Sequence, residues 1–155
     1  MEICTERCLI RKFEEHDIAD FMVYRNDMDW MKFQGFKGLT SREYQAVLLG
    51  EHTFQDGVQL AVIHKESTKL IGDVYLKQEQ DAFWIGCSIC RTMACQGYAF
   101  EVASAVIVSL RDKGVVFVKA GVECGNTASI ALLKKLSFSY IGMDNDEQIF
   151  ALELK

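Results

Sequence analysis

The sequence predicts a mixed α/β (α+β) domain in which helices flank a central, twisted and largely antiparallel sheet of about seven strands. Three observations predict it. In the first half, three strand-like runs follow one another with only short turns between them, which is typical of an antiparallel meander. In the second half, helical and strand-like periodicities alternate. One run there, 115–122, is apolar on both faces, as a strand buried beside a helix should be. The expected order is βααβββαβαββ.

The first part of the chain is expected to hold one strand and two or more helical pieces before the meander. Residues 7–13 have the composition of a short strand, and apolar residues recur at helical spacing over 15–26. A second short helical piece is expected to hold Trp30 and Phe33. The segment 40–50 opens with the Thr-x-x-Glu form of a capping box, which predicts a helix start.

After that helix the periodicity changes from helical to alternating, and strands and helices are expected to follow to the end of the chain. Gly114 is the predicted stop signal of the long helix, and the Asp-Asn-Asp segment 144–146 is the predicted final turn. The elements expected here, in chain order, are the strands 58–64, 70–77 and 82–90, the helix 97–113, the strand 115–122, the helix 126–136, and the strands 138–142 and 148–154.

Composition indicates one soluble globular domain spanning 1–155. The chain has 155 residues, with 17 Lys and Arg against 22 Asp and Glu and a formal net charge of −5. Half of its residues are hydrophobic, so a core can form without disulfides or a structural metal. The acidic balance argues against a nucleic-acid partner, because neutralising phosphates requires clustered Lys and Arg. It gives a weak bias toward a cationic partner such as an amine.

The six cysteines are expected to be mostly small buried hydrophobes in a reducing, cytoplasmic setting. No basic leader with an apolar run begins the sequence, and no apolar stretch approaches the length of a membrane helix, so no membrane partner is expected. The pair Cys87 and Cys90 has the spacing of half a zinc motif. In a strand, however, residues three apart point to opposite faces, and no second pair exists, so no metal is expected.

The segment with most chemical content is 91–101, which joins an expected strand to an expected helix. Gly97 stands at the helix start, where free N–H groups and a partial positive charge suit a phosphate or pyrophosphate. A glycine there lets the backbone approach an anion closely. A single glycine at a helix start is more often only part of a turn, and both interpretations stay open on local grounds.

In this context the sequence resembles the GNAT acetyltransferase superfamily, in particular its ribosomal-protein N-terminal acetyltransferase-like branch. The acyl-CoA loop of that family, Gln/Arg-x-x-Gly-x-Gly/Ala, corresponds to Ala94–Ala99, and Gly-Tyr-Ala-x-Glu at 97–101 is typical of the branch. The resemblance covers nearly the whole chain. Its further motifs are Leu9-Ile-Arg11, Glu15-His-Asp17, Tyr24-Arg-Asn-Asp27, Phe33-Gln34, Ile71-Gly-Asp73 and the segment from Asn126 through Ser129 to Phe138.

The resemblance implies an acetyl-CoA-dependent N-acetyltransferase that moves an acetyl group to a primary amine, on a protein N-terminus or a small molecule. The amine would attack directly in a ternary complex. The strands 82–90 and 115–122 would splay apart, and the pantetheine arm would pair with the free edge. An N–H near Ile89 or Cys90 would polarise the thioester carbonyl. The residues implied in donor binding are Cys87, Ile89, Ala94, Cys95, Gln96, Gly97, Tyr98, Ala99, Asn126 and Ser129.

The acid and the base are less well defined by the resemblance. Ser129 matches the Ser of the branch and is a candidate hydrogen-bond donor to the departing sulfur; an ordinary first-turn helix serine is the equal alternative. Asn126 suits both an N-cap and a cofactor contact. As general base, Glu123 ranks first because it ends a strand at the expected active edge. Asp73, His64 and a water chain are alternatives, and His64 is more readily explained as a structural histidine.

Departures from the family pattern motivate a second hypothesis, in which the chain is a catalytically degenerate GNAT-fold protein that binds CoA or another ligand without turnover. Ala94 stands where Gln or Arg is usual, Cys95 where Gly is common, and Trp84 where the branch often has Glu. Leu133 occupies the position of the Tyr that protonates the leaving thiolate in many members. A third hypothesis, a redox or metal protein built on the cysteines, requires stoichiometric zinc.

The acceptor side is only outlined by the sequence. In the resembled family the early helices and the following loop wall the acceptor site, so Trp30, Phe33, Phe36 and Tyr44 are candidates, with ordinary core packing as the alternative. A homodimer is the expected oligomer if the chain self-associates, because an exposed strand edge at 148–154 would allow pairing between subunits.

Overall fold

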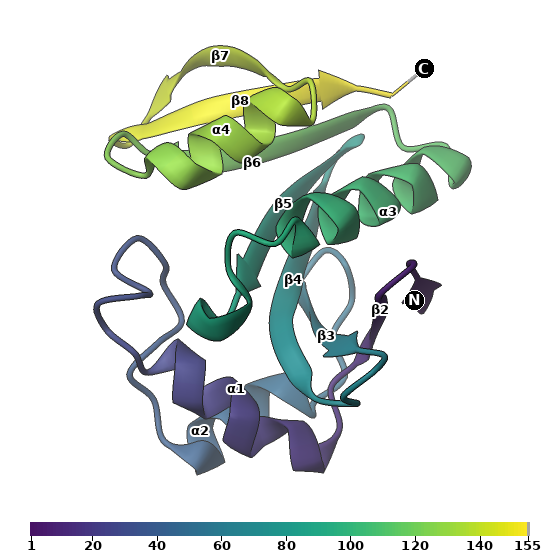
Figure 1. The fold of residues 1–155 in the computed structure, drawn as a ribbon. Helices are drawn as coiled ribbons and strands as arrows, with labels where there is room; N and C mark the ends of the chain where they lie inside the picture. Colours follow the sequence, from purple (N-terminus) through teal and green to yellow (C-terminus); the bar gives the residue numbers. More distant parts are fainter. Residues whose placement is uncertain (155) are drawn as a thin grey trace.

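The computed structural model describes residues 1–154. Its strands form one sheet in the order β1-β2-β3-β4-β5-β6-β8-β7, with helices on both faces (Figure 1). The strands are β1 (Ile3–Cys4), β2 (Cys8–Lys12), β3 (Val58–His64), β4 (Leu70–Glu79), β5 (Ala82–Ile89), β6 (Phe117–Glu123), β7 (Ser139–Asp144) and β8 (Glu147–Glu153). The helices are α1 (Ile18–Arg25), α2 (Ser41–Leu48), α3 (Tyr98–Asp112) and α4 (Thr127–Lys135), with short 3-10 turns η1 (Glu15–Asp17) and η2 (Arg91–Met93).

The predicted fold class is confirmed, because the sheet is largely antiparallel and the meander β3–β4–β5 pairs as expected. Its middle strands are buried on both faces. Along β3, Leu60 and Val62 pack into a core shared with α3 and α4, while Ala61 and Ile63 pack into a second core beneath α1 and α2. This alternation is the period of two that a strand imposes, and it makes the molecule a three-layer structure.

Local signals place the helix starts where the sequence predicts them. The Thr40 side chain accepts from the backbone N–H of Glu43, and the Glu43 carboxylate accepts from the N–H of Thr40, which completes the capping box of α2. Asn126 caps α4 by accepting from the N–H of Ser129 at 3.2 Å. Gly97 is the N-cap of α3, and Gly114 follows its end with φ at 84°.

Two expectations about the fold are wrong. Residues 28–33 form turns instead of a short helix; the indole N–H of Trp30 donates to the carbonyl oxygen of Ile89 at 2.9 Å, and this distant contact outweighs the local periodicity. The segment 148–154 is also not a free edge, because β8 pairs with β6 on one side and with β7 on the other. The edge of the sheet at this end is β7, which carries the exposed side chains of Tyr140, Ile141 and Met143.

The expected divergence of the third meander strand from the next strand is present. β5 and β6 run parallel and pair only over Ala82–Trp84 and Phe117–Lys119. Beyond these residues the two strands separate, and the half of the sheet that holds β6, β8 and β7 turns away from the meander (Figure 1). The divergence leaves the edge of β5 that faces β6 unpaired beyond Trp84.

Candidate functional site

The loop from β5 to α3 presents backbone N–H groups that have no partner. The chain passes through two left-handed residues, Cys95 at φ 60° and Gly97 at φ 83°. Within residues 1–154, the N–H groups of 95–100 donate to no acceptor, and the first bonded one is that of Glu101, to Gly97 O at 3.0 Å. Unpaired N–H groups at the positive end of a helix form a site for phosphate oxygens.

A free strand edge leads into this loop. Hydrogen bonds in an antiparallel pair alternate between the two sides of a strand. The N–H of Cys90 donates to Ile71 O at 2.7 Å, toward β4, so the register directs the backbone groups of Cys87 and Ile89 to the other side. There the carbonyl of Ile89 accepts from the Trp30 indole, while its N–H lies beyond the last pairing with β6.

A cleft of about 210 Å³ occupies the opening between the two halves of the sheet. Gly86 and Cys87 of β5 form part of one wall. Asn126 and Ser129, at the start of α4, line it from the other half, together with Glu147 of β8. The divergence of the strands has therefore created a passage lined by backbone edge, amide, hydroxyl and carboxylate groups.

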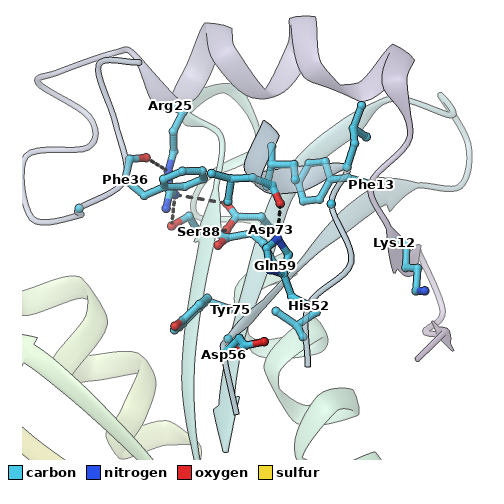
Figure 2. A pocket seen from close by; sticks show the side chains of 18 of the residues that line it. Lys12, Phe13, Arg25, Phe36, His52, Asp56, Gln59, Asp73, Tyr75 and Ser88 are labelled. Carbon is cyan, nitrogen blue, oxygen red and sulfur yellow. Dashed lines mark hydrogen bonds and ion pairs between the residues drawn. The ribbon is translucent and has the colours of Figure 1, made fainter. Parts of the chain in front are cut away.

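A larger cavity of about 900 Å³ lies on the face of the sheet that α1 and α2 cover (Figure 2). The loop 49–57 and the strands β3, β4 and β5 form most of its walls. The cavity and the cleft share four lining residues, which are Gln34, Gly35, Gly86 and Cys87. A molecule in the cleft and a molecule in the cavity can therefore meet beside Cys87.

A buried polar cluster borders the larger cavity. Asp73 is only 2% exposed, and its carboxylate accepts from the Gln59 amide and from Arg25 Nη1 at 3.3 Å (Figure 2). The Tyr24 hydroxyl donates to the same carboxylate. Arg25 also donates to Ser88 Oγ at 3.1 Å. Burial, and secondly the Asp73 charge, raise the pKa of Tyr24 well above its ordinary value, so this phenol stays a donor.

The family of the chain follows from its match to a known domain. A family model described as "Acetyltransferase (GNAT) domain" matches residues 7–139. The chain belongs to the GNAT acetyltransferase family. No curated protein matches the sequence significantly.

Solved structures agree with this assignment at the level of the fold. A GNAT-family acetyltransferase from Bacillus anthracis is 23% identical, with a TM-score of 0.87 over 99% of this chain and 98% of its own. A ribosomal-protein-alanine acetyltransferase from Vibrio fischeri is 17% identical, with a TM-score of 0.79 over 100% and 97%. A spermidine N-acetyltransferase from Vibrio cholerae, solved with CoA and spermine, is 13% identical, with a TM-score of 0.78 over 96% of each chain.

The residues that the GNAT resemblance implies in donor binding fall into three groups. Cys87, Asn126 and Ser129 line the cleft, Ile89 lies at the free edge of β5, and Ala94–Ala99 span the loop and the first residues of α3. Cys95 adopts a left-handed conformation although it carries a side chain, so the loop keeps the turn that glycine would favour. Of the two N–H groups expected to polarise a thioester, that of Cys90 is engaged with β4, which leaves Ile89.

Among the acids and bases considered from the sequence of this GNAT domain, only Ser129 lines the cleft. The Ser129 hydroxyl has no hydrogen-bond partner within residues 1–154. Glu123 is exposed at the end of β6 and lines neither the cleft nor the cavity. The His64 ring contacts the Tyr98 hydroxyl at 3.0 Å and Ser67 Oγ at 3.1 Å, and it lines neither the cleft nor the cavity. Asp73 lines the larger cavity, but it is buried and its carboxylate accepts from Tyr24, Gln59 and Arg25.

Glu147 is a residue of the cleft that the sequence analysis did not identify. It begins β8 directly opposite Glu123 of β6, and a Cβ on Gly121 would lie 3.2 Å from its carboxylate. In the sequence it follows the acidic turn 144–146 and resembles part of a solvated surface. Only the pairing of β8 with β6 brings this carboxylate into the cleft, and no local signal indicates that pairing.

The loop after α1 joins the two halves of the site. Trp30 is bonded to β5, and the ring of Phe33 reaches the other half, where a Cβ on Gly125 would lie 3.4 Å from it. The next residues, Gln34 and Gly35, line both the cleft and the cavity. Of the aromatic residues considered for the acceptor side, Phe36 lines the cavity and Tyr44 is fully buried in the core.

Cys87 is expected to be the least reactive of the thiols in the site, although it lies where the two cavities meet. Burial, reinforced by the Asp73 charge, raises its pKa to about 12. At pH 8 only about 1 in 10,000 of such thiols is ionised. Timed alkylation with iodoacetamide followed by peptide mass spectrometry should show the exposed Cys95 and Cys124 modified at least about 100-fold faster than Cys87. Equal alkylation rates of the three cysteines in the folded protein would contradict this environment for Cys87. Urea-unfolded protein is the control, in which the three thiols should react at similar rates.

Among residues 1–154, no group of three or more His, Cys, Asp and Glu side chains is arranged to hold a metal ion. No helix in this part of the chain has the length and apolar character needed to cross a bilayer.

Proposed function

We propose that this GNAT protein is an acetyl-CoA-dependent N-acetyltransferase that transfers acetyl to a primary amine by direct attack. The observation that carries the proposal is the meeting of the cleft and the cavity beside Gly86 and Cys87. A donor in the cleft and an acceptor in the cavity would come into contact there, so the chain needs no covalent intermediate.

The donor side has the groups that acetyl-CoA requires. The unpaired N–H groups of 95–100 would accept the pyrophosphate oxygens. The free backbone groups of Cys87 would pair with the amides of the pantetheine arm, as an added strand does, because the Ile89 carbonyl already accepts from Trp30. Asn126 and Ser129 would line the opposite side of the arm. Acetyl-CoA supplies an activated acyl group, and the remaining chemistry belongs to residues of this chain.

Three groups of the chain are assigned to the transfer itself. The Ile89 N–H lies at the free edge and would stabilise negative charge on the carbonyl oxygen. The Ser129 hydroxyl, free of protein partners, would donate to the departing sulfur. We assign proton removal from the amine to Glu147, through water, because Glu147 lines the cleft. Glu123, the residue that the sequence favoured, lies opposite Glu147 in the strand pair; both residues are exposed, but Glu123 lines neither the cleft nor the cavity.

The acceptor cavity supports a cationic or peptide-like amine. Glu51 and Asp56 contribute exposed carboxylates at its rim, and Phe13, Phe36 and Tyr75 contribute aromatic surface. Carboxylates and aromatic rings attract an ammonium group. Related structures are named as acting on a ribosomal-protein alanine and on spermidine, so protein N-termini and polyamines are the first acceptors to test. We further propose that the protein acts in the cytoplasm and binds neither nucleic acid nor metal.

The test of this proposal is thiol release from acetyl-CoA in the presence of peptides with free N-termini, polyamines and other primary amines. At least one primary amine is expected to be acetylated, while a tertiary amine is not. Glu147→Gln is expected to lower kcat by roughly 100-fold and Ser129→Ala by about 10-fold. The matched control is Glu66→Gln, in the exposed turn between β3 and β4. CoA binding without transfer to any amine would support the degenerate alternative, which Leu133 motivates because it is buried in the cleft.

A further inference from the structure

An arginine that is distant in sequence contacts the donor loop, the segment from β5 to the start of α3. Arg7 lies in the bend between β1 and β2. Its Nη1 donates to the carbonyl oxygen of Gln96 at 3.1 Å, and its guanidinium carbon lies 3.9 Å from the centroid of the Tyr98 ring. Its Nη2 lies 3.5 Å from the position that a Cβ on Gly97 would take. One side chain therefore contacts Gln96 and Tyr98 and lies beside Gly97 between them.

The guanidinium of Arg7 is itself held in a fixed orientation. Its Nε donates to Glu101 Oε1 at 2.7 Å, and its backbone N–H donates to Oε2 of the same carboxylate at 2.8 Å. The Thr5 hydroxyl donates to that oxygen at 2.6 Å. The Tyr98 ring, on which the guanidinium stacks, is buried and contacts His64 through its hydroxyl at 3.0 Å. These contacts direct the planar fork of Arg7 at Gln96 O, while its side chain remains 37% exposed.

The contact with Gln96 O determines the direction of the next N–H group. In a planar trans peptide the C=O and the N–H point in opposite directions. Because Arg7 binds the carbonyl of Gln96, the N–H of Gly97 in the same peptide points away from Arg7, toward the open side of the loop. The loop needs such a restraint, since Cys95 has a left-handed conformation that side chains rarely favour. Within the loop, Gln96 Nε2 also donates to Thr92 O at 3.3 Å, and Cys90 Sγ lies 3.4 Å from Thr92 Oγ1.

We infer that Arg7 is a positioning residue for the donor loop, which it holds in the conformation that presents the N–H groups of 95–100 to the pyrophosphate of CoA. This role rests on the proposed function. Arg7 acts through the Gln96–Gly97 peptide and need not touch the ligand. A guanidinium is suited to the task because its rigid fork can bind Glu101 and Gln96 O at once while it stacks on Tyr98, and an ammonium group cannot do all three.

The experiment compares Arg7→Ala and Arg7→Lys with the parent protein by calorimetric titration of CoA and of dephospho-CoA. Both variants are expected to raise the Kd for the two ligands by about 10-fold, and by the same factor, because both ligands carry the pyrophosphate. In turnover, KM for acetyl-CoA should rise while kcat changes less than about twofold. Arg111→Ala, exposed at the C-terminal end of α3, is the matched control and should bind as the parent does.

A second measurement does not depend on CoA. In ¹⁵N-labelled free protein, Arg7→Ala should shift the amide signals of Gln96 and Gly97 and lower their order parameters, whereas Arg111→Ala should not.

Three results would overturn the inference. Unchanged loop amides in Arg7→Ala would show that Arg7 does not hold the loop. Full rescue of CoA affinity by Arg7→Lys would show that charge alone matters. A larger loss for CoA than for dephospho-CoA would show direct contact with the 3′-phosphate. If the parent protein binds no CoA, the proposed function fails. The amide spectra still decide whether Arg7 holds the loop.

Discussion

Replacing Gly97 with valine is expected to raise the Kd for CoA by about 100-fold or more. Gly97 has φ at 83°, a region that a β-branched residue avoids, so the N-cap of α3 would have to rearrange. The N–H groups at the start of the helix would then lose their common direction toward the ligand. Calorimetric titration of CoA into both proteins measures the change.

The chain offers a matched control for this substitution at the other end of the same helix. Gly114 has φ at 84°, and no atom lies within 4 Å of a Cβ built on it. Gly114→Val should therefore impose similar backbone strain on the end of α3 while leaving the donor loop intact. If both variants lose CoA affinity equally, the loss comes from the helix as a whole, and the placement of the pyrophosphate at Gly97 is wrong.

The second large effect concerns stability. Arg25→Met is expected to lower the free energy of unfolding by about 3 kcal/mol, because it leaves the Asp73 carboxylate buried without its cationic partner. The side chains of Arg25 and Asp73 are 6% and 3% exposed, so the pair is largely shielded from solvent. Urea unfolding followed by circular dichroism measures the change.

A double-mutant cycle separates the ion pair from the packing of the arginine side chain. Asp73→Asn removes the charge but keeps a carbonyl acceptor for the Tyr24 hydroxyl, so adding it to Arg25→Met should recover part of the lost stability. Arg42→Met, exposed on α2, is the control and should change stability by less than about 0.5 kcal/mol. Strictly additive single substitutions would show that Arg25 and Asp73 do not interact.

The fold was predictable where local patterns decide the structure. Capping groups at Thr40 and Asn126 and the positive-φ glycines at 97 and 114 set the helix boundaries, and these signals lie within a few residues of each other. The order of the strands in the sheet, by contrast, depends on contacts between segments that are distant in sequence. The inner position of β8 depends on hydrogen bonds to β6, which is separated from it by α4 and β7, so a pattern along the chain could not show it.

The same distinction applies to the site. The donor loop was predictable because its glycine, its helix start and its family motif are contiguous in sequence. Arg7 and Glu147 were not, because each reaches the site from another part of the chain: Arg7 contacts the loop across 89 residues, and Glu147 enters the cleft through strand pairing. Trp30 shows the reverse error, in which a helical pattern gives way to a bond with Ile89.

The most direct test of the account is a titration of ¹⁵N-labelled protein with CoA, followed by amide chemical shifts. We expect saturable binding in which the largest shifts occur at the N–H groups of 95–100 and at the free edge of β5, at Cys87 and Ile89. The surface around Glu2 and Asp112, on the far part of α3, should not respond. No binding, or shifts centred away from the loop and the free edge, would contradict the assignment of this site to acetyl-CoA.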